Sequence, residues 1–159
     1  MGAYRRILAA IDLSEESRAV SARACELART ADGVVKLLHV IEFVPIEPMS
    51  DSLVPVVQID DQMLSRARRQ LEELAAELGL PADAGSVETG NAKSEILRYV
   101  REQHIDLIVI GCRERHGLSL LVHRTEDSVL HAAPCDVLAV RVGEPAAALA
   151  RHRTTSSQT

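Results

Sequence analysis

Aromatic residues are nearly absent from this chain, which has one Phe, two Tyr and no Trp among 159 residues. Single-stranded nucleic acids and sugars are commonly bound by stacking on aromatic side chains, and this chain has little material for such a platform. A net charge of −5 also works against contact with phosphate backbones. The composition therefore predicts no nucleic-acid partner.

Long hydrophobic runs are missing as well. No stretch of the sequence approaches the roughly 18 to 20 apolar residues of a membrane-spanning helix. The opening residues, MGAYRRILAAID, lack the apolar segment and cleavage site of a secretory signal, and Arg6 stands where a myristoylation signal needs Ser or Thr. We therefore expect a cytoplasmic protein with no membrane partner.

Cysteines are few and isolated. Cys25, Cys112 and Cys135 form no CxxC pair, and their odd number suits a reducing compartment. Cys112 is expected to follow the carboxyl end of one strand and Cys135 to precede the amino end of the next, about 15 Å apart in a parallel sheet. We expect no disulfide between them.

The histidines also lack the spacing of a metal site. No pair among the five that invite a metal interpretation has HxxxH spacing: His39, His104, His116, His123 and His131. His39 lies inside an apolar run and is predicted to be a hydrogen-bonded core residue. We therefore predict no metal site.

What the chain does contain is a regular alternation of short apolar runs and amphipathic segments. Strands are predicted at Arg6 to Asp12, Val34 to Ile41, Gly85 to Thr89, Asp106 to Gly111 and Val137 to Val142. Helices are predicted after Ser14 as an N-cap, from Ile59 to Gly79, around Ile96, Leu97 and Val100, and from Thr125 to His131. This order predicts an α/β fold, a doubly wound five-stranded parallel sheet with helices on both faces. Ligands of such sheets bind at the carboxyl ends of the strands.

Two segments fall outside the alternation. Residues 42–58 contain Pro45, Pro48 and Pro55 and are predicted to form a long loop. The loop is unusually apolar, and its side chains would cap the core, line a dimer contact or bind an unknown protein partner: Phe43, Val44, Ile46, Leu53, Val54, Val56 and Val57. Residues 144–159 are predicted to be a flexible C-terminal tail, which leaves one domain, residues 1–143.

Three blocks carry a family pattern, namely RILAAIDLSEES near the start, LLHVIE at the second strand, and DLIVIGCRERHGLSLLVHRTEDSVLHAAPCDVLAVRV near the end. In this order and spacing they resemble the universal stress protein family, over about Tyr4 to Val142. The resemblance implies a Rossmann-like, adenine-nucleotide alpha-hydrolase-like fold. It also implies a cytoplasmic, usually dimeric stress-response protein with no established catalytic chemistry.

The family has two groups, of which one binds ATP through a loop of pattern G-x2-G-x9-G-(S/T) and the other has lost that loop. Laid on this pattern, Gly111 matches the first glycine and Thr125 the final Ser/Thr. Glu114 and Arg124 occupy the second and third glycine positions. Side chains there obstruct the approach of backbone N–H groups to phosphate, and Glu114 adds like-charge repulsion. Glu126, in the first turn of the next helix, places a further carboxylate where phosphate would sit.

Other residues of the predicted site favour nucleotide binding or are compatible with both its presence and its absence. By resemblance, Asp12 and Val40 would touch ribose and adenine, although an Asp at a strand end is also a common turn residue. The same loop is rich in basic residues that can grip phosphate, or else pair with the neighbouring carboxylates: Arg113, Arg115, His116, His123 and Arg124. Ser119, His116 and Glu114 lack the strained turn of a hydrolase nucleophile.

Together these features predict a non-enzymatic, dimeric universal stress protein that lacks tight ATP binding and uses no cofactor. The alternative is an ATP-binding stress sensor whose arginines replace the glycines. The last strand, Val137 to Val142, is expected at a sheet edge, where a homodimer would pair two copies of it.

Overall fold

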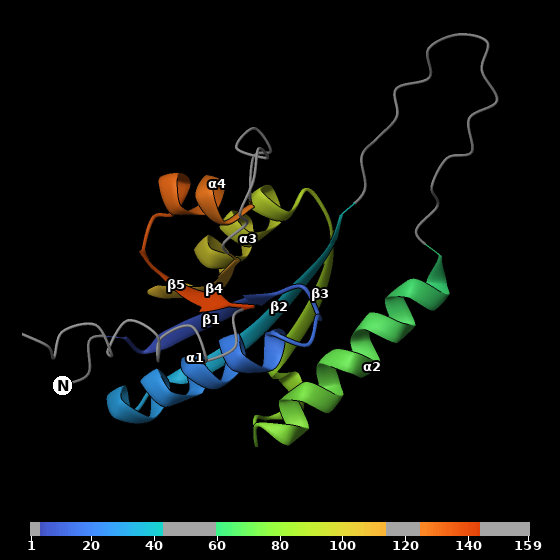
Figure 1. The fold of residues 1–159 in the computed structure, drawn as a ribbon, viewed down its shortest axis with the longest axis horizontal. Helices are drawn as coiled ribbons and strands as arrows, with labels where there is room; N and C mark the ends of the chain where they lie inside the picture. The colour runs from blue at the N-terminus through green and yellow to red at the C-terminus, as the bar shows by residue number, and fades with distance from the viewer. Residues whose placement is uncertain (1–3, 43–59, 114–124, 144–159) are drawn as a thin grey trace, which may run out of the picture.

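The computed structural model describes residues 4–42, 60–113 and 125–143, and the strands in these segments form one parallel sheet (Figure 1). The strands stand in the order β3-β2-β1-β4-β5. Their bounds are β1 Arg6–Ile11, β2 Val34–Glu42, β3 Gly85–Gly90, β4 Leu107–Arg113 and β5 Asp136–Val142. The predicted α/β class and five-stranded parallel sheet are confirmed.

The helices of the described segments divide equally between the two faces of the sheet. The helices α1 (Ser17–Ala31) and α2 (Asp61–Glu77) cover one face, and α3 (Ala92–Glu102) and α4 (Thr125–Ala132) cover the other (Figure 1). A short 3-10 turn, Ala82–Ala84, leads from α2 into β3. In this part of the chain no helix combines the length and apolar character needed to cross a bilayer.

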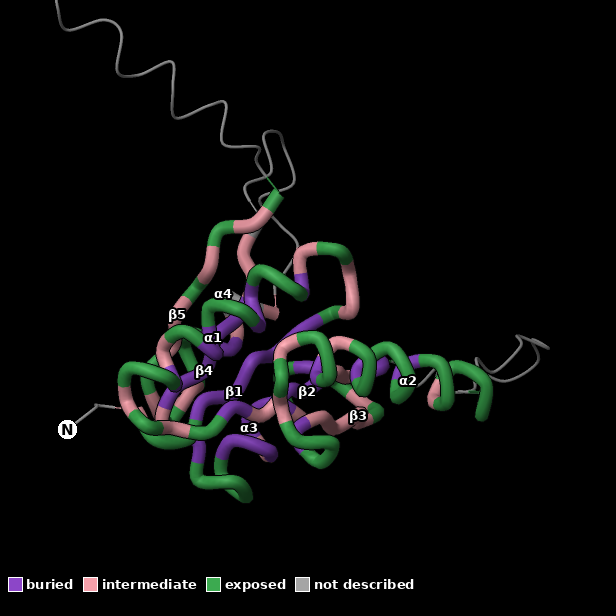
Figure 2. Tube along the Cα trace, turned by 90° about the horizontal axis from the view of Figure 1, so that it is seen from below, coloured by how far each residue is buried: buried purple, intermediate pink, exposed green. Residues whose placement is uncertain are grey.

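The central strand β1 supplies both cores. Alternate side chains point to opposite faces, so Ile7, Ala9 and Ile11 pack beneath α1 and α2, while Leu8 and Ala10 pack beneath α3 and α4. Every residue from Ile7 to Ile11 is at most 9% exposed, and Figure 2 shows β1 as a buried trace at the centre of the molecule. Burial on both faces explains why the strand reads as a continuous apolar run.

The start of α1 differs from the prediction. The helix begins at Ser17, and its N-cap is Glu16, whose side chain caps no helical N–H group. Ser14 instead lies in the preceding turn, where its backbone N–H donates to Asp12 Oδ1 at 3.0 Å. The predicted N-cap at Ser14 is therefore wrong, because the carboxylate of Asp12 competes for the local backbone.

The other helix ends follow the sequence signals closely. Asp60 caps α2 by accepting from the backbone N–H of Gln62 at 2.6 Å, and Gly79, at φ 68°, ends the helix region in the left-handed conformation that glycine favours. The chain turns from α1 into β2 at Asp32 and Gly33, with Asp32 as the C-cap of α1 at φ 51°. A side chain at position 33 would come within 2.8 Å of the backbone oxygen of Tyr4, so the chain requires glycine there.

Candidate functional site

The strand order places the candidate site at the carboxyl edge of β1 and β4. The chain moves from β1 outward through β2 and β3, then crosses to the other side of β1 for β4 and β5. In doubly wound sheets, ligands bind at the point where the direction reverses, because the loops after the two central strands diverge there. Here that point lies after Ile11 of β1 and Arg113 of β4.

Three of the predicted site residues share this edge. Ile11 is level with His39 on β2, and Ala10 is level with Ile110 on β4. Asp12, Val40 and Gly111 each follow one of these paired positions, so the sheet register brings them to neighbouring rows.

The carboxylate of Asp12 is engaged in the turn that follows β1. Its Oδ1 accepts hydrogen bonds from the Ser14 backbone N–H at 3.0 Å and from the Ser17 Oγ at 3.1 Å. Leu13, between them, has φ 59°, a conformation that costs energy in a residue other than glycine. Asp12 thus fixes a strained turn and the first residue of α1. The geometry supports the turn-residue interpretation of Asp12 directly.

His39, near the end of β2, contacts the backbone of β1. The His39 Nδ1 lies 2.9 Å from the backbone oxygen of Ile11, which confirms the prediction of a hydrogen-bonded histidine. The ring is only partly buried, however. Val40, the next residue, packs partly buried against the core beneath α3 and α4. Both side chains therefore have structural partners.

Gly111 has a packing role that its place in a phosphate loop does not explain. A Cβ at this position would lie 3.2 Å from Val20 Cγ2 and 3.5 Å from Val142 Cγ2. The first of these separations is tighter than ordinary van der Waals contact. The missing side chain therefore lets the N-terminal part of α1 approach β4 closely.

The remaining predicted residues are described only in part. Thr125 begins α4 and is partly buried. Glu114 and Arg124 lie outside the described residues, as do Ser119, His116 and the other basic residues between them, and Glu126 is placed in α4 without its side chain being described. Residues 43–59 and 144–159, which include the apolar loop and the tail, also lie outside.

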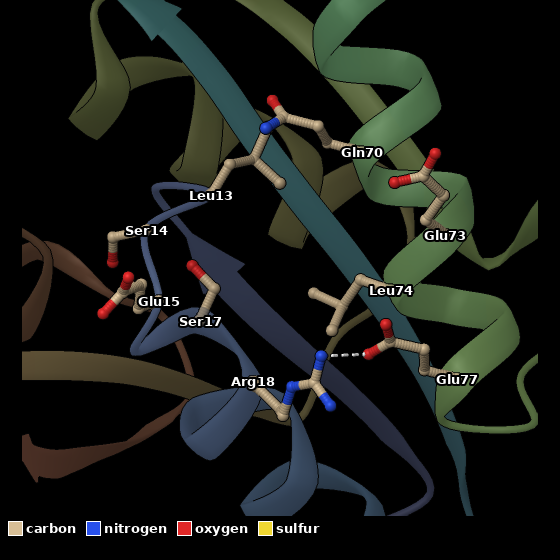
Figure 3. Close-up of a pocket in the computed structure, with 9 residues that line it drawn as sticks. All are labelled: Leu13, Ser14, Glu15, Ser17, Arg18, Gln70, Glu73, Leu74 and Glu77. Atoms are coloured by element: carbon tan, nitrogen blue, oxygen red, sulfur yellow. Dashed lines mark ion pairs between the residues drawn. The ribbon is translucent and has the colours of Figure 1, made fainter.

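A pocket on the α1 and α2 face was not foreseen from the sequence. It has a volume of about 190 Å³ and opens between the turn after β1 and the last turns of α2 (Figure 3). Its lining is Leu13, Ser14, Glu15, Ser17, Arg18, Gln70, Glu73, Leu74 and Glu77. The Arg18 guanidinium lies 2.6 Å from the Glu77 carboxylate.

The charge of this pocket is negative. Within the described part of the chain, the side chains of Glu15 and Glu73 have neither an ion pair nor a hydrogen bond, so two carboxylates remain uncompensated. Such a lining repels phosphate and favours a cationic group. The only sequence signal for it is the concentration of glutamates in the last turns of α2, which ordinarily indicates a solvated helix face.

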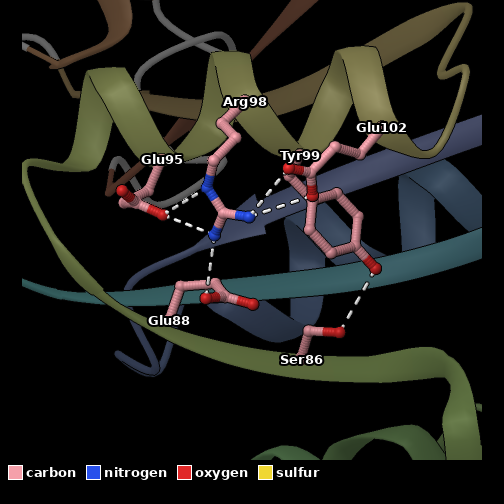
Figure 4. A network of polar contacts seen from close by, with 6 residues as sticks. All are labelled: Ser86, Glu88, Glu95, Arg98, Tyr99 and Glu102. Carbon is pink, nitrogen blue, oxygen red and sulfur yellow. Dashed lines mark hydrogen bonds and ion pairs between the residues drawn. The ribbon is translucent and has the colours of Figure 1, made fainter.

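A second polar cluster stabilises α3 against β3. The Arg98 guanidinium contacts the carboxylates of Glu88, Glu95 and Glu102 at 2.6 to 3.1 Å (Figure 4). Hydrogen bonds to Glu95 and Glu102 raise the pKa of Arg98 above its usual value. The guanidinium and the three carboxylates bind one another, so the cluster acts as a structural link between β3 and α3.

The cysteines lie on separate elements, as predicted. Cys112 is level with Arg141 near the carboxyl end of β5, whereas Cys135 directly precedes Asp136 at the amino end of that strand. Burial raises the pKa of the Cys135 thiol, and the nearby carboxylates of Asp136 and Asp106 add to the effect. Among the described residues, no group of three His, Cys, Asp or Glu side chains is arranged to hold a metal ion.

The fold and the position of the site define a class: a doubly wound α/β protein with its candidate site at the switch between β1 and β4. Comparison with known proteins narrows the class to one family. Residues 3–141 match the model of the Universal stress protein family, and the chain belongs to that family.

Individual relatives agree over nearly their whole length. The chain is 35% identical to universal stress protein A homolog 2 of Coxiella burnetii, over 89% of this chain and 98% of that protein, and 36% identical to homolog 1 of the same organism, over 89% and 99%. Among solved structures, universal stress protein UspA from Lactobacillus plantarum is 25% identical with a TM-score of 0.60, over 87% of this chain and 98% of that one.

A more distant match concerns ligand binding in another protein. A universal stress protein solved in complex with cAMP is 19% identical, with a TM-score of 0.57, over 86% of this chain and 96% of that one. At this identity the likeness shows a shared fold.

Proposed function

We propose that this chain is a non-enzymatic stress-response protein of the cytoplasm in which the ATP loop is degenerate. The observation that carries the proposal is the presence of Glu114 and Arg124 at two positions where the ATP-binding group of the family has glycine. Both side chains obstruct the backbone cradle, and a carboxylate adds repulsion toward a triphosphate. We further propose that residues 1–143 form the functional domain and residues 144–159 a flexible tail.

The surroundings of the predicted site support this proposal. Gly111, the one matching glycine, has a packing reason to be glycine, and the carboxylate of Asp12 is engaged in the turn after β1. Retention of these two residues is therefore expected even in a chain that has no nucleotide to bind. Their presence is not an argument for ATP.

The test is titration with Mg-ATP. We expect a dissociation constant of the wild-type chain no tighter than about 1 mM, which is roughly −4 kcal/mol. The glycine pair Glu114→Gly and Arg124→Gly restores backbone access, and the triple variant adds Glu126→Val to remove a carboxylate from the helix N-terminus. Removing one like charge is worth on the order of 1 kcal/mol, so the triple variant should bind at least several-fold more tightly than wild type.

The glycine pair keeps Glu126, so comparing it with the triple variant isolates the effect of the Glu126 carboxylate. A micromolar dissociation constant for the wild-type chain would overturn the proposal. If wild type, pair and triple variant all fail to bind, the obstruction lies elsewhere, in the region of Asp12 and Val40, and the explanation through the loop is wrong.

The alternative function is an adenine-nucleotide sensor in which arginines replace the glycine cradle. It is favoured by the basic content of residues 113–124 and by the existence of a cAMP complex of the same fold. In that case wild type binds nucleotide, and Arg124→Gly weakens binding where the proposed function expects it to help. The sign of that single change separates the two functions.

A further inference from the structure

Helix α2 carries its charges in an unusual order. Arg66, Arg68 and Arg69 stand in its N-terminal half, while Glu72, Glu73 and Glu77 stand in its C-terminal half. A helix dipole favours the reverse arrangement, with acids near the N-terminus and bases near the C-terminus. Asp60 and Asp61 at the start of the helix do match the dipole, but the last turn holds Glu77 and no basic residue, so the acidic C-terminal end does not serve the stability of the isolated helix.

Four of these charges form what we call the outer stripe of α2: Arg66, Arg69, Glu73 and Glu77. The buried side of the helix is defined by Ala67, Leu71 and Ala75. With 3.6 residues per turn, positions two residues on either side of Leu71 point almost directly away from the sheet, and Arg66 and Glu77 flank them. The stripe is basic at one end and acidic at the other.

The outer stripe is accessible and lacks partners at most of its positions. Arg66, Arg69 and Glu73 are exposed, and within the described segments none of their side chains has an ion pair or hydrogen bond. Glu77 pairs with Arg18, but both side chains stay substantially exposed, at 47% and 67%. In the two views of Figures 1 and 2, the N-terminal half of α2 extends beyond the sheet.

The acidic end of the stripe is also the rim of the pocket between α1 and α2. Glu73 and Glu77 belong to both, and Glu15 faces the same pocket from the turn after β1 (Figure 3). The apolar side chains of Leu13 and Leu74 lie beside these carboxylates. This combination suits the guanidinium and methylene stem of an arginine.

From these observations we infer that α2 is a self-association surface, and that its occupant is α2 of a second copy of this chain. In an antiparallel pair of helices with a two-fold axis near Leu71, Arg69 of one copy lies opposite Glu73 of the other, and Arg66 lies opposite Glu77. The two-fold axis doubles both contacts, so four ion pairs form from one self-complementary stripe. Arg66 of each copy then reaches the acidic pocket of the other.

This inference does not rest on the proposed function, and its test is independent of nucleotide. The full-length chain is examined by sedimentation velocity over a range of concentrations at about 50 mM and about 500 mM salt, because ionic screening is much stronger at the higher value. We expect a salt-sensitive association step at low salt, in addition to whatever mass persists at high salt. A mass that is the same at both salt concentrations would overturn the inference.

Reversing the charges of Arg69 and Glu73 tests whether α2 is the association surface. Arg69→Glu and Glu73→Arg each turn two symmetry-related attractive contacts into repulsive ones and should weaken the salt-sensitive step by about tenfold or more. An equimolar mixture of the two variants restores complementary charges across the contact. The double variant R69E/E73R restores them within one chain, and both samples should associate like wild type.

The double variant is also the control for folding, because both positions are exposed and a Glu followed four residues later by Arg is favourable in a helix. Arg68→Glu, nearer the sheet-facing side of the helix, is the matched charge control and should weaken association less than R69E. Equal association by R69E, E73R and wild type would exclude α2 as the surface. Failure of both the mixture and the double variant to recover would exclude the antiparallel pairing.

Discussion

Gly111 illustrates how a single residue can fit a ligand motif and a packing requirement at once. The packing requirement is explicit in the structure, since a side chain there would meet Val20 of α1 at 3.2 Å. We expect Gly111→Val to lower the free energy of unfolding by about 1–3 kcal/mol, the usual cost of adding bulk to a packed site. Urea denaturation measures this change.

A double-mutant cycle separates packing from other causes. If the contact with Val20 is responsible, Val20→Ala should make room for the new side chain, and the two changes should be non-additive by about 0.5 kcal/mol or more. The single variant Val20→Ala provides the reference for the cavity that it creates by itself. Strict additivity would show that the cost of Gly111→Val arises elsewhere.

At the scale of elements, β5 is the edge strand on which the proposed homodimer depends. Leu138, Val140 and Val142 are only partly buried against the core beneath α1, and Ala139 is exposed. An edge strand with apolar side chains and unpaired backbone groups invites another chain. We propose that Val137 to Val142 pairs antiparallel with the same strand of a second copy.

The two-fold symmetry of this dimer identifies a position, Ala139, at which a charged substitution should weaken it. The centre of Asp136–Val142 is Ala139, which would lie opposite its own copy across the two-fold axis. Ala139→Lys places like charges directly opposite each other and should weaken the dimer about tenfold or more without unfolding the exposed site. Ala139→Thr, which is neutral and suits a strand, should leave it intact. Light scattering that shows only wild-type monomer at micromolar concentration would contradict the proposal.

The elements themselves were largely predictable, and the exceptions have two separate causes. β1 and the first part of β4 are buried on both faces and read as continuous apolar runs, whereas β3 is only partly buried and leaves a weaker signal in the sequence. The start of α1 was mistaken because Asp12 and Ser14 compete for the same backbone groups, a matter of local geometry. The pocket between α1 and α2 was missed because it combines Glu15 with Glu73, residues far apart in the chain.

The candidate site was predictable to the extent that sheet topology determines it. The register brings Asp12, Val40 and Gly111 to neighbouring rows at one sheet edge, and their role toward a nucleotide stays a prediction. The sequence does not reveal the contact between Gly111 and Val20, because packing across elements leaves no local pattern. The effect of Glu114 and Arg124 stays a prediction.

At the scale of the whole molecule, the two proposed contacts lie at opposite edges of the sheet. β5 forms one edge, and α2 packs against β3 and β2 near the other. Each contact is self-complementary and uses a different surface, so one copy can engage two neighbours at the same time. Such an arrangement gives either an extended row of copies or a closed assembly.

The combination of variants tests this arrangement. At low salt the wild-type chain should exceed the mass of a dimer, whereas Ala139→Lys alone and Arg69→Glu alone should each stop at a dimer, because each removes one of the two contacts. The combined variant should be a monomer. High salt should reduce wild type to a dimer, since it screens the ion pairs of α2 and leaves backbone pairing at β5 in place. Sedimentation equilibrium supplies the masses. A combined variant that remains dimeric would reveal a third contact, and a wild type that never exceeds a dimer would show that the two surfaces are not used together.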